Sequence, residues 1–248
     1  MHPRTLLGAL FAGLAGSSPG IATAAEACTA TSPRTVVPVV ELYTSEGCNS
    51  CPPADRWLSG LKSAPDVVAL AFHVDYWDRL GWKDRFASPA FTQRQADRQA
   101  STGARFSYTP QVVVDGMDRK DWSSLRVPAG SRPQATVTVS MAREGDRVVA
   151  TVLPSAGAPK RLAAYWAVTE QAHATAVKAG ENDGAMLRHD FVVRDYEAAP
   201  PWLVRAGAAE TLRFAPPSRA HPSHPRSVNL VVVDATTGRP VQALKLDC

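Results

Sequence analysis

The sequence lacks several features that would point to a particular partner or setting. It has no dense stripe of lysine and arginine: 27 basic and 23 acidic side chains leave a net charge of only +4, and they are spread singly along the chain. We therefore expect no nucleic-acid partner, since such proteins usually carry a basic patch. It also has no apolar run of about 20 residues, the length of a membrane-spanning helix. We find no internal repeat and no low-complexity tract.

The first 24 residues predict an export signal. A short basic start at Met1 to Arg4 is followed by an apolar run over 6–16 and by small residues ending at Ala24. We expect cleavage after Ala24, which leaves no membrane span and places the mature protein in the periplasm or outside the cell. Lipidation at Cys28 is the alternative, but Glu26 stands where a small apolar residue is expected.

Cysteine is scarce: the mature chain has four, at positions 28, 48, 51 and 248. Four cysteines allow three pairings. Cys48 and Cys51 are separated by two residues and can close a small ring without disturbing the backbone. Cys28 and Cys248 stand near the two mature ends, which often lie close together in a domain. We predict a structural disulfide between Cys28 and Cys248.

Hydrophobic patterning predicts two domains within the 248 residues. Residues 36–43 and 67–74 are typical of strands buried on both faces of a parallel sheet. A helix after Cys51 and a polar helix from Ser88 complete an α/β pattern. After a hairpin signal near Gly145, short strands at regular spacing predict a β-sandwich. We expect an N-terminal extension at 25–35, an α/β domain at 36–130 and an all-β sandwich-like domain at 131–248.

The sharpest chemical signal is the Cys48-x-x-Cys51 motif at the start of a predicted helix. Backbone N–H groups and the helix dipole stabilise a thiolate there, so Cys48 is the candidate nucleophile and Cys51 the resolving thiol. The alternatives are an inert disulfide and half of a zinc site. Zinc would need a second pair of ligands at metal spacing, so we expect no metal and no cofactor.

Two further segments are candidates for substrate binding. An X-Pro bond is the main place where a cis peptide is tolerated, and a cis Thr109–Pro110 bond would expose the Thr109 backbone to a substrate chain. Tyr76 and Trp77, in an aromatic-rich loop, would grip a peptide or a small thiol. The alternatives are a trans proline on an edge strand and a hydrophobic cluster under a long loop.

The chain resembles known families at several of these motifs. A strand entering the cysteine motif, a polar helix and Thr-Pro before a strand resemble thioredoxins over residues 36–127. Nearly the whole mature chain resembles the exported bacterial family called domain of unknown function 1223. The motifs that carry this second resemblance are VELYTSEGCNSCPPAD, FHVDYWDRLGWKDRFASPAFTQRQ, YTPQVVVDG, GENDGAML and VVRD. The family is thioredoxin-like in its first domain, so the resemblance implies an α/β thioredoxin-like fold there.

The thioredoxin resemblance also implies a role for Glu41. Many thioredoxins carry a buried acid on this strand that relays a proton from the resolving thiol, and Glu41 is the matching candidate. The alternative is an edge position or an ion pair with an arginine.

These observations predict an exported thiol-disulfide oxidoreductase that acts on protein or small-molecule thiols and disulfides. Two alternatives stay open. One is a copper(I)-binding module in which both thiolates bind the metal, together with His73. The other is a non-catalytic binding protein whose cysteine pair is a permanent disulfide.

Overall fold

The computed structural model describes residue 1 and residues 28–64, 66–103, 105–127, 130–205 and 207–248. The predicted export signal and its cleavage site at Ala24 therefore lie outside the described residues. Within those residues, no helix is both long enough and apolar enough to cross a membrane.

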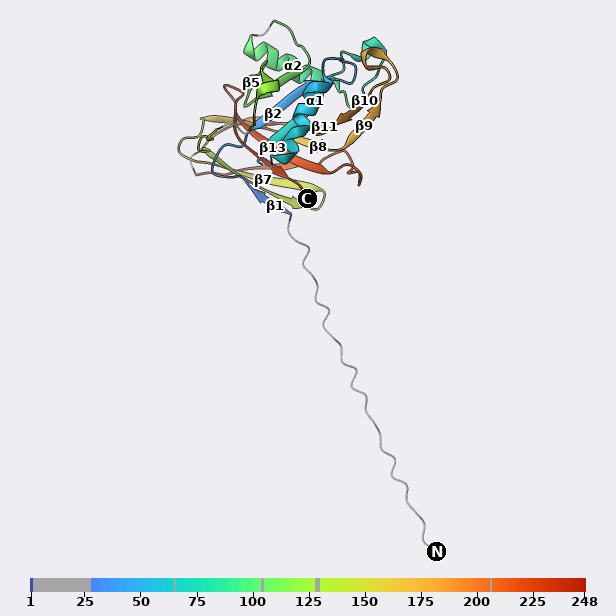
Figure 1. The fold of residues 1–248 in the computed structure, drawn as a ribbon. Helices are drawn as coiled ribbons and strands as arrows, with labels where there is room; N and C mark the ends of the chain where they lie inside the picture. The colour runs from blue at the N-terminus through green and yellow to red at the C-terminus, as the bar shows by residue number, and fades with distance from the viewer. Residues whose placement is uncertain (2–27, 65, 104, 128–129, 206) are drawn as a thin grey trace.

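The strands of the described residues form three sheets, and Figure 1 shows how these strands are arranged in space. The largest contains, in spatial order, β14 (Pro240–Leu246), β13 (Arg226–Asp234), β8 (Arg161–Glu170), β11 (Val192–Leu203), β3 (Val68–His73), β2 (Val39–Thr44), β4 (Gln111–Val114) and β5 (Met117–Asp118). A second sheet has the order β1 (Thr29–Thr31), β6 (Val137–Glu144), β7 (Arg147–Pro154) and β12 (Glu210–Phe214). The third is the pair β10 (Met186–His189) and β9 (His173–Ala176).

Two α-helices occur in the described part of the chain, α1 (Pro52–Ser59) and α2 (Pro89–Thr102). Each has a proline in its first turn, where the N–H that proline lacks would have no partner within the helix. The Ser88 hydroxyl accepts a hydrogen bond from the Ala90 N–H and so caps α2. The 3-10 helices are η1 (Gly60–Ser63), η2 (Asp78–Leu80), η3 (Trp122–Ser124) and η4 (Gly180–Asn182).

The large sheet is covered by different elements at its two ends. At the β14–β13–β8 end, the four-stranded sheet packs against one face, and Trp166 stacks on Phe214 with ring centroids 5.3 Å apart. At the other end, α1 packs against the face that carries Val40 and Leu42. Phe91 of α2 packs on the opposite face with Tyr43. The helices therefore sandwich the strands that lead to the cysteine motif.

The predicted fold class, an α/β thioredoxin-like domain followed by a separate all-β sandwich, is wrong. Among the described residues, 42% lie in strands and 16% in helices, so this part of the chain is mostly β. Strands from both sides of residue 130 belong to one eight-stranded sheet. The join is β11, which runs antiparallel to β8 and parallel to β3, where Val192 pairs with Ala71. Local patterning cannot reveal hydrogen bonds between segments more than 100 residues apart.

A disulfide joins Cys28 to Cys248, the pairing that the sequence predicts, with their Cα atoms 5.8 Å apart. Figure 1 places the C-terminus beside β1, which follows Cys28 directly and pairs with β6. The Arg143 side chain of β6 also donates a hydrogen bond of 2.9 Å to the Cys248 carbonyl oxygen. The bond therefore fastens the last residue of the chain to the edge of the four-stranded sheet.

Candidate functional site

The Cys48–Cys51 pair forms a disulfide at the junction of β2 and α1. The chain turns after Thr44, with the Cys48 N–H bonded to the Ser45 carbonyl at 3.2 Å, and α1 begins directly after Cys51. Both cysteine side chains are fully buried at 0% exposure, whereas Asn49 and Ser50 between them are exposed. Only the two intervening residues of the ring therefore face solvent.

The first turn of α1 offers fewer donors to a thiolate than the motif predicts. Pro52 and Pro53 have no N–H, and the N–H groups of Ala54 and Asp55 both donate to the Cys51 carbonyl oxygen. The helix dipole remains. The polar group beside the Cys48 sulfur is the Ser50 hydroxyl, whose oxygen lies 3.4 Å from Sγ.

The structure brings Trp77 to the cysteine turn and joins Thr109 to Trp77. A Cβ atom on Gly47 would lie only 3.0 Å from the Trp77 Cβ, so the turn approaches Trp77 as closely as a glycine allows. The Trp77 indole N–H donates to the Thr109 hydroxyl oxygen at 2.8 Å, and the Thr109–Pro110 bond is cis as expected. Tyr76 instead donates to the Gln95 side-chain oxygen at 3.3 Å. Substrate binding by these residues stays a prediction.

The 3-10 helix η4, to which the sequence analysis gave no role, contacts the turn that carries the cysteine pair. The Asn182 side-chain amide donates to the carbonyl oxygens of Glu46, at 2.8 Å, and of Cys48, at 3.0 Å. The Glu181 carboxylate accepts a hydrogen bond of 3.1 Å from the Asn49 N–H. Both residues lie in the GENDGAML motif, where the order of residues resembles a turn and gives no sign of this contact.

Buried titratable groups gather around Glu46, in the turn that leads to the disulfide. His73, at the end of β3, lies 2.6 Å from Asp84 between its Nδ1 and the carboxylate, and both side chains are 0% exposed. Burial alone would raise the pKa of Asp84, but the contact with His73 and the N–H groups of Glu46 and Phe86 lower it to about 2. The copper alternative paired His73 with the thiolates, and the structure pairs it with Asp84 instead.

His189, at the end of β10, lies between two carboxylates of this buried group. Its ring nitrogens are each 3.5 Å from a carboxylate oxygen, Nε2 from Glu46 and Nδ1 from Asp55. Burial lowers the pKa of His189, but the two carboxylates outweigh it and hold the pKa at about 9. Neither His189 nor Asp55 carries a signal in the sequence, because residues from three separate elements make the cluster.

Glu41 lies on the face of β2 opposite to α1, because it alternates with Val40 and Leu42. Its carboxylate accepts hydrogen bonds from Arg94 of α2 and from the Tyr165 hydroxyl. Burial would raise the pKa of Glu41, but the charges of Arg94 and Arg98 with these hydrogen bonds lower it. The arginine pairing that the sequence left as the alternative is thus present, and the proton-relay role of Glu41 stays a prediction.

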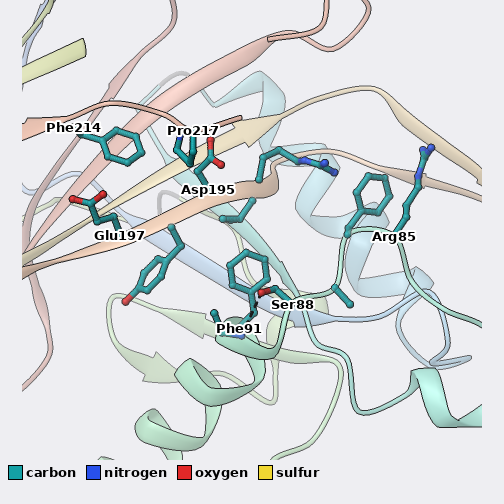
Figure 2. Close-up of a pocket in the computed structure, with 13 residues that line it drawn as sticks. Arg85, Ser88, Phe91, Asp195, Glu197, Phe214 and Pro217 are labelled. Carbon is teal, nitrogen blue, oxygen red and sulfur yellow. Dashed lines mark hydrogen bonds between the residues drawn. The ribbon is translucent and has the colours of Figure 1, made fainter. Parts of the chain in front are cut away.

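A pocket of about 370 Å³ lies elsewhere on the molecule, and Figure 2 draws the residues that line it. Arg85 and Ser88 lie on one side of it, and Asp195, Glu197 and Phe214 lie on the other. The Asp195 carboxylate is engaged by Arg226 at 2.9 Å. None of the residues predicted to act in thiol chemistry lines this pocket.

The comparisons with known proteins assign a family and a fold. Residues 39–233 match the family described as "Protein of unknown function (DUF1223)". The crystal structure of protein AGR_C_4864 from Agrobacterium tumefaciens is similar at 28% identity and a TM-score of 0.63, over 86% of this chain and 95% of that one. HBP35 of Porphyromonas gingivalis has a TM-score of 0.60 at 16% identity, over 87% of this chain and 76% of that one, and shows the fold alone. No curated protein matches the chain.

Proposed function

The chain belongs to the DUF1223 family, which carries no assigned activity, and from its site we propose that it is an exported thiol-disulfide exchange protein. The observation that supports this most is the disulfide between Cys48 and Cys51 at the start of α1. A dithiol three residues apart can open and close without moving the strand and helix that flank it. A purely structural bond has no need of so short a ring.

In the proposed reaction the reduced protein acts in two steps. The Cys48 thiolate attacks one sulfur of a substrate disulfide, forms a mixed disulfide and releases the other substrate sulfur as a thiolate. The Cys51 thiol then loses its proton, attacks Cys48 Sγ and releases the second substrate thiolate. Two electrons pass to the substrate, and the protein is left with the Cys48–Cys51 bond. The same steps in reverse oxidise a substrate dithiol.

The surroundings of Cys48 suit it to the first step. The Ser50 hydroxyl can donate to its thiolate, and a hydrogen bond to the charged form favours that form. Trp77, which packs beside the turn, and Thr109, which is bonded to Trp77, would border the bound substrate. Because the sulfur itself is buried, an attacking thiol also requires η4 to shift.

Export is part of the proposal and is supported by the other disulfide. Bonds such as Cys28–Cys248 persist in oxidising compartments and are rare in the cytosol. The predicted signal at residues 1–24 is consistent with such a compartment. Its cleavage is checked by sequencing the mature N-terminus.

The reduction potential of the Cys48–Cys51 bond tests the proposal. The mature protein is equilibrated in glutathione and dithiothreitol buffers, the free thiols are trapped, and peptides are assigned by mass spectrometry. A potential between about −120 and −270 mV lies in the range of exchange catalysts, and one below about −300 mV marks a structural bond. Cys28–Cys248 in the same sample serves as the internal control, with a value in the structural range.

A trapping experiment tests the order of the two cysteines. With Cys51→Ser, the mixed disulfide with a peptide disulfide should accumulate at Cys48, because no resolving thiol is present. With Cys48→Ser, no such adduct should accumulate at Cys51. Adducts at Cys51 alone would reverse the assignment, and a potential in the structural range would favour the non-catalytic alternative.

A further inference from the structure

Three buried side chains of the kinds that bind metals converge one helical turn after Cys51. Asp55 lies on α1, His73 at the end of β3 and His189 at the end of β10. One ligand atom from each lies within 4.8 Å of the other two. Their exposed fractions are only 6%, 0% and 3%. The cluster is therefore closed to bulk water and built from three elements distant in sequence.

Three of the four imidazole nitrogens of this cluster make no hydrogen bond of good geometry. His73 Nε2 is buried and has no hydrogen-bond partner within the described chain. The two ring nitrogens of His189 are also buried, and they make only the 3.5 Å ionic contacts with Glu46 and Asp55. A buried ring nitrogen without a partner costs free energy whichever tautomer is present. Asp84 occupies His73 Nδ1, which leaves Nε2 as the nitrogen available to a ligand.

Each of the three side chains is oriented by a second polar group. Asp84 lies 2.6 Å from His73 Nδ1, on the far side of the ring from the unpartnered Nε2. Glu46 lies 3.5 Å from His189 Nε2. The Thr44 hydroxyl donates to Asp55 Oδ2 at 2.9 Å and leaves Oδ1 toward His189. Metal-binding histidines characteristically place their other nitrogen on a carboxylate in this way.

We propose that Asp55 Oδ1, His73 Nε2 and His189 Nδ1 bind a divalent zinc-type cation. The proton on His189 Nδ1 leaves as the ion binds, because a histidine must be neutral to be a metal ligand. Zinc bonds of about 2.0–2.2 Å set neighbouring ligand atoms about 3.3–3.5 Å apart, and the Asp55 and His189 atoms already lie 3.5 Å apart. The widest pair needs to close by at most about 1.4 Å. Two imidazoles and a carboxylate suit Zn²⁺, whereas soft copper(I) prefers sulfur.

The ion would join the first turn of α1, which follows the cysteine pair, to the ends of β3 and β10. Asp55 follows Cys51 by one turn, and Glu46, which contacts His189, precedes Cys48 by two residues. The proposed zinc site uses no cysteine: its ligands are one carboxylate and two imidazoles, and all four cysteines are in disulfides. Zinc binding therefore does not require thiol exchange. The proposal therefore stands or falls separately from the proposed function.

The test uses the full mature chain without a polyhistidine tag, with both disulfides oxidised and no free thiol detected. After treatment with a chelator, Zn²⁺ is titrated in by calorimetry and bound zinc is counted by atomic emission. We expect one zinc per chain and a higher melting temperature with the ion. Co²⁺ as a probe should give the visible bands of a four- or five-coordinate nitrogen and oxygen site, without a sulfur charge-transfer band.

Variants locate the ion. His73→Gln and His189→Gln should each weaken zinc binding more than tenfold. The matched control is His173→Gln, since His173 is also buried, also packs on Phe86 and has an unpartnered Nδ1; its zinc binding should equal that of the parent. Should a glutamine variant fail to fold, Asp55→Asn and the Co²⁺ spectrum of the parent still decide. A folded parent that takes up no zinc at micromolar concentration, or binding lost only with His173→Gln, overturns the proposal.

Discussion

The Asn182 side chain donates a hydrogen bond of 3.0 Å to the Cys48 carbonyl oxygen across 134 residues of sequence. The same nitrogen also holds the Glu46 carbonyl at 2.8 Å. One amide group thus fixes two carbonyls of the turn that leads into the cysteine ring. A segment from the second half of the chain thereby controls the surroundings of a sulfur in the first half.

Asn182→Ala should speed the reduction of the Cys48–Cys51 bond several-fold. Loss of the amide frees η4 to move away from the buried sulfur, and the carbonyl oxygens left unpaired should lower the free energy of unfolding by about 1–3 kcal/mol. The measurement is the rate of thiol release in dithiothreitol. Asp183→Ala changes an exposed neighbour in the same segment and should leave the rate unchanged. An unaltered rate in a folded Asn182→Ala protein would argue against a covering role.

Ser50→Ala should make the reduction potential of Cys48–Cys51 more negative. The hydroxyl 3.4 Å from Cys48 Sγ favours the thiolate, and therefore the reduced form. Losing about 1 kcal/mol of that stabilisation corresponds to about 20 mV for a two-electron couple. Asn49→Ala is the matched control in the same exposed loop. A potential that rises in Ser50→Ala would contradict this assignment.

Glu41→Gln should remove part of the acid sensitivity of the fold. Because the folded pKa of Glu41 is lowered below 4.5, its ionised form stabilises the protein above that value, and the contribution is lost as pH falls through the folded pKa. The variant should lose about 3–5 kcal/mol near pH 7, since Arg94 is left as an unpaired buried charge. It should also show a flatter decline below pH 4.5.

Urea denaturation at a series of pH values measures this difference. Asp121→Asn is the control, because Asp121 pairs with Arg119 at the exposed surface, where ion pairs contribute little to stability. If the free energy of unfolding falls equally steeply below pH 4.5 in the parent and in Glu41→Gln, other groups cause the loss of stability in acid.

Replacing both Cys28 and Cys248 by serine should destabilise the protein by about 2–5 kcal/mol, because the bond closes a loop with a sequence separation of 220 residues. The urea midpoint should fall, and the reduction potential of Cys48–Cys51 should stay the same, since no contact joins the two bonds among the described residues. A changed potential would show that the two disulfides are coupled.

Local features of the fold could be predicted from the sequence. The runs 36–43 and 67–74 became β2 and β3, and prolines at first-turn positions marked both α-helices. Chemical features formed by residues close together in sequence, such as the Cys48–Cys51 ring, could be predicted equally well. Each of these follows from residues a few positions apart.

Long-range features escaped prediction for a physical reason. The insertion of β11 beside β3 merges two predicted domains into one sheet, and no local pattern specifies that pairing. His189 and Asn182 likewise act on residues more than 100 positions away. His189 ends β10, a short strand that was not expected, so nothing in its own segment marked it.

The Cys28–Cys248 bond also decides how the protein bears a mechanical load. With the Cα atoms of its first cysteine and last residue 5.8 Å apart and covalently linked, a pulling force between these points passes through the sulfur–sulfur bond. The strands between them then carry no tension until that bond is reduced. Reduction would convert a mechanically closed ring into a chain that can be unravelled from its ends.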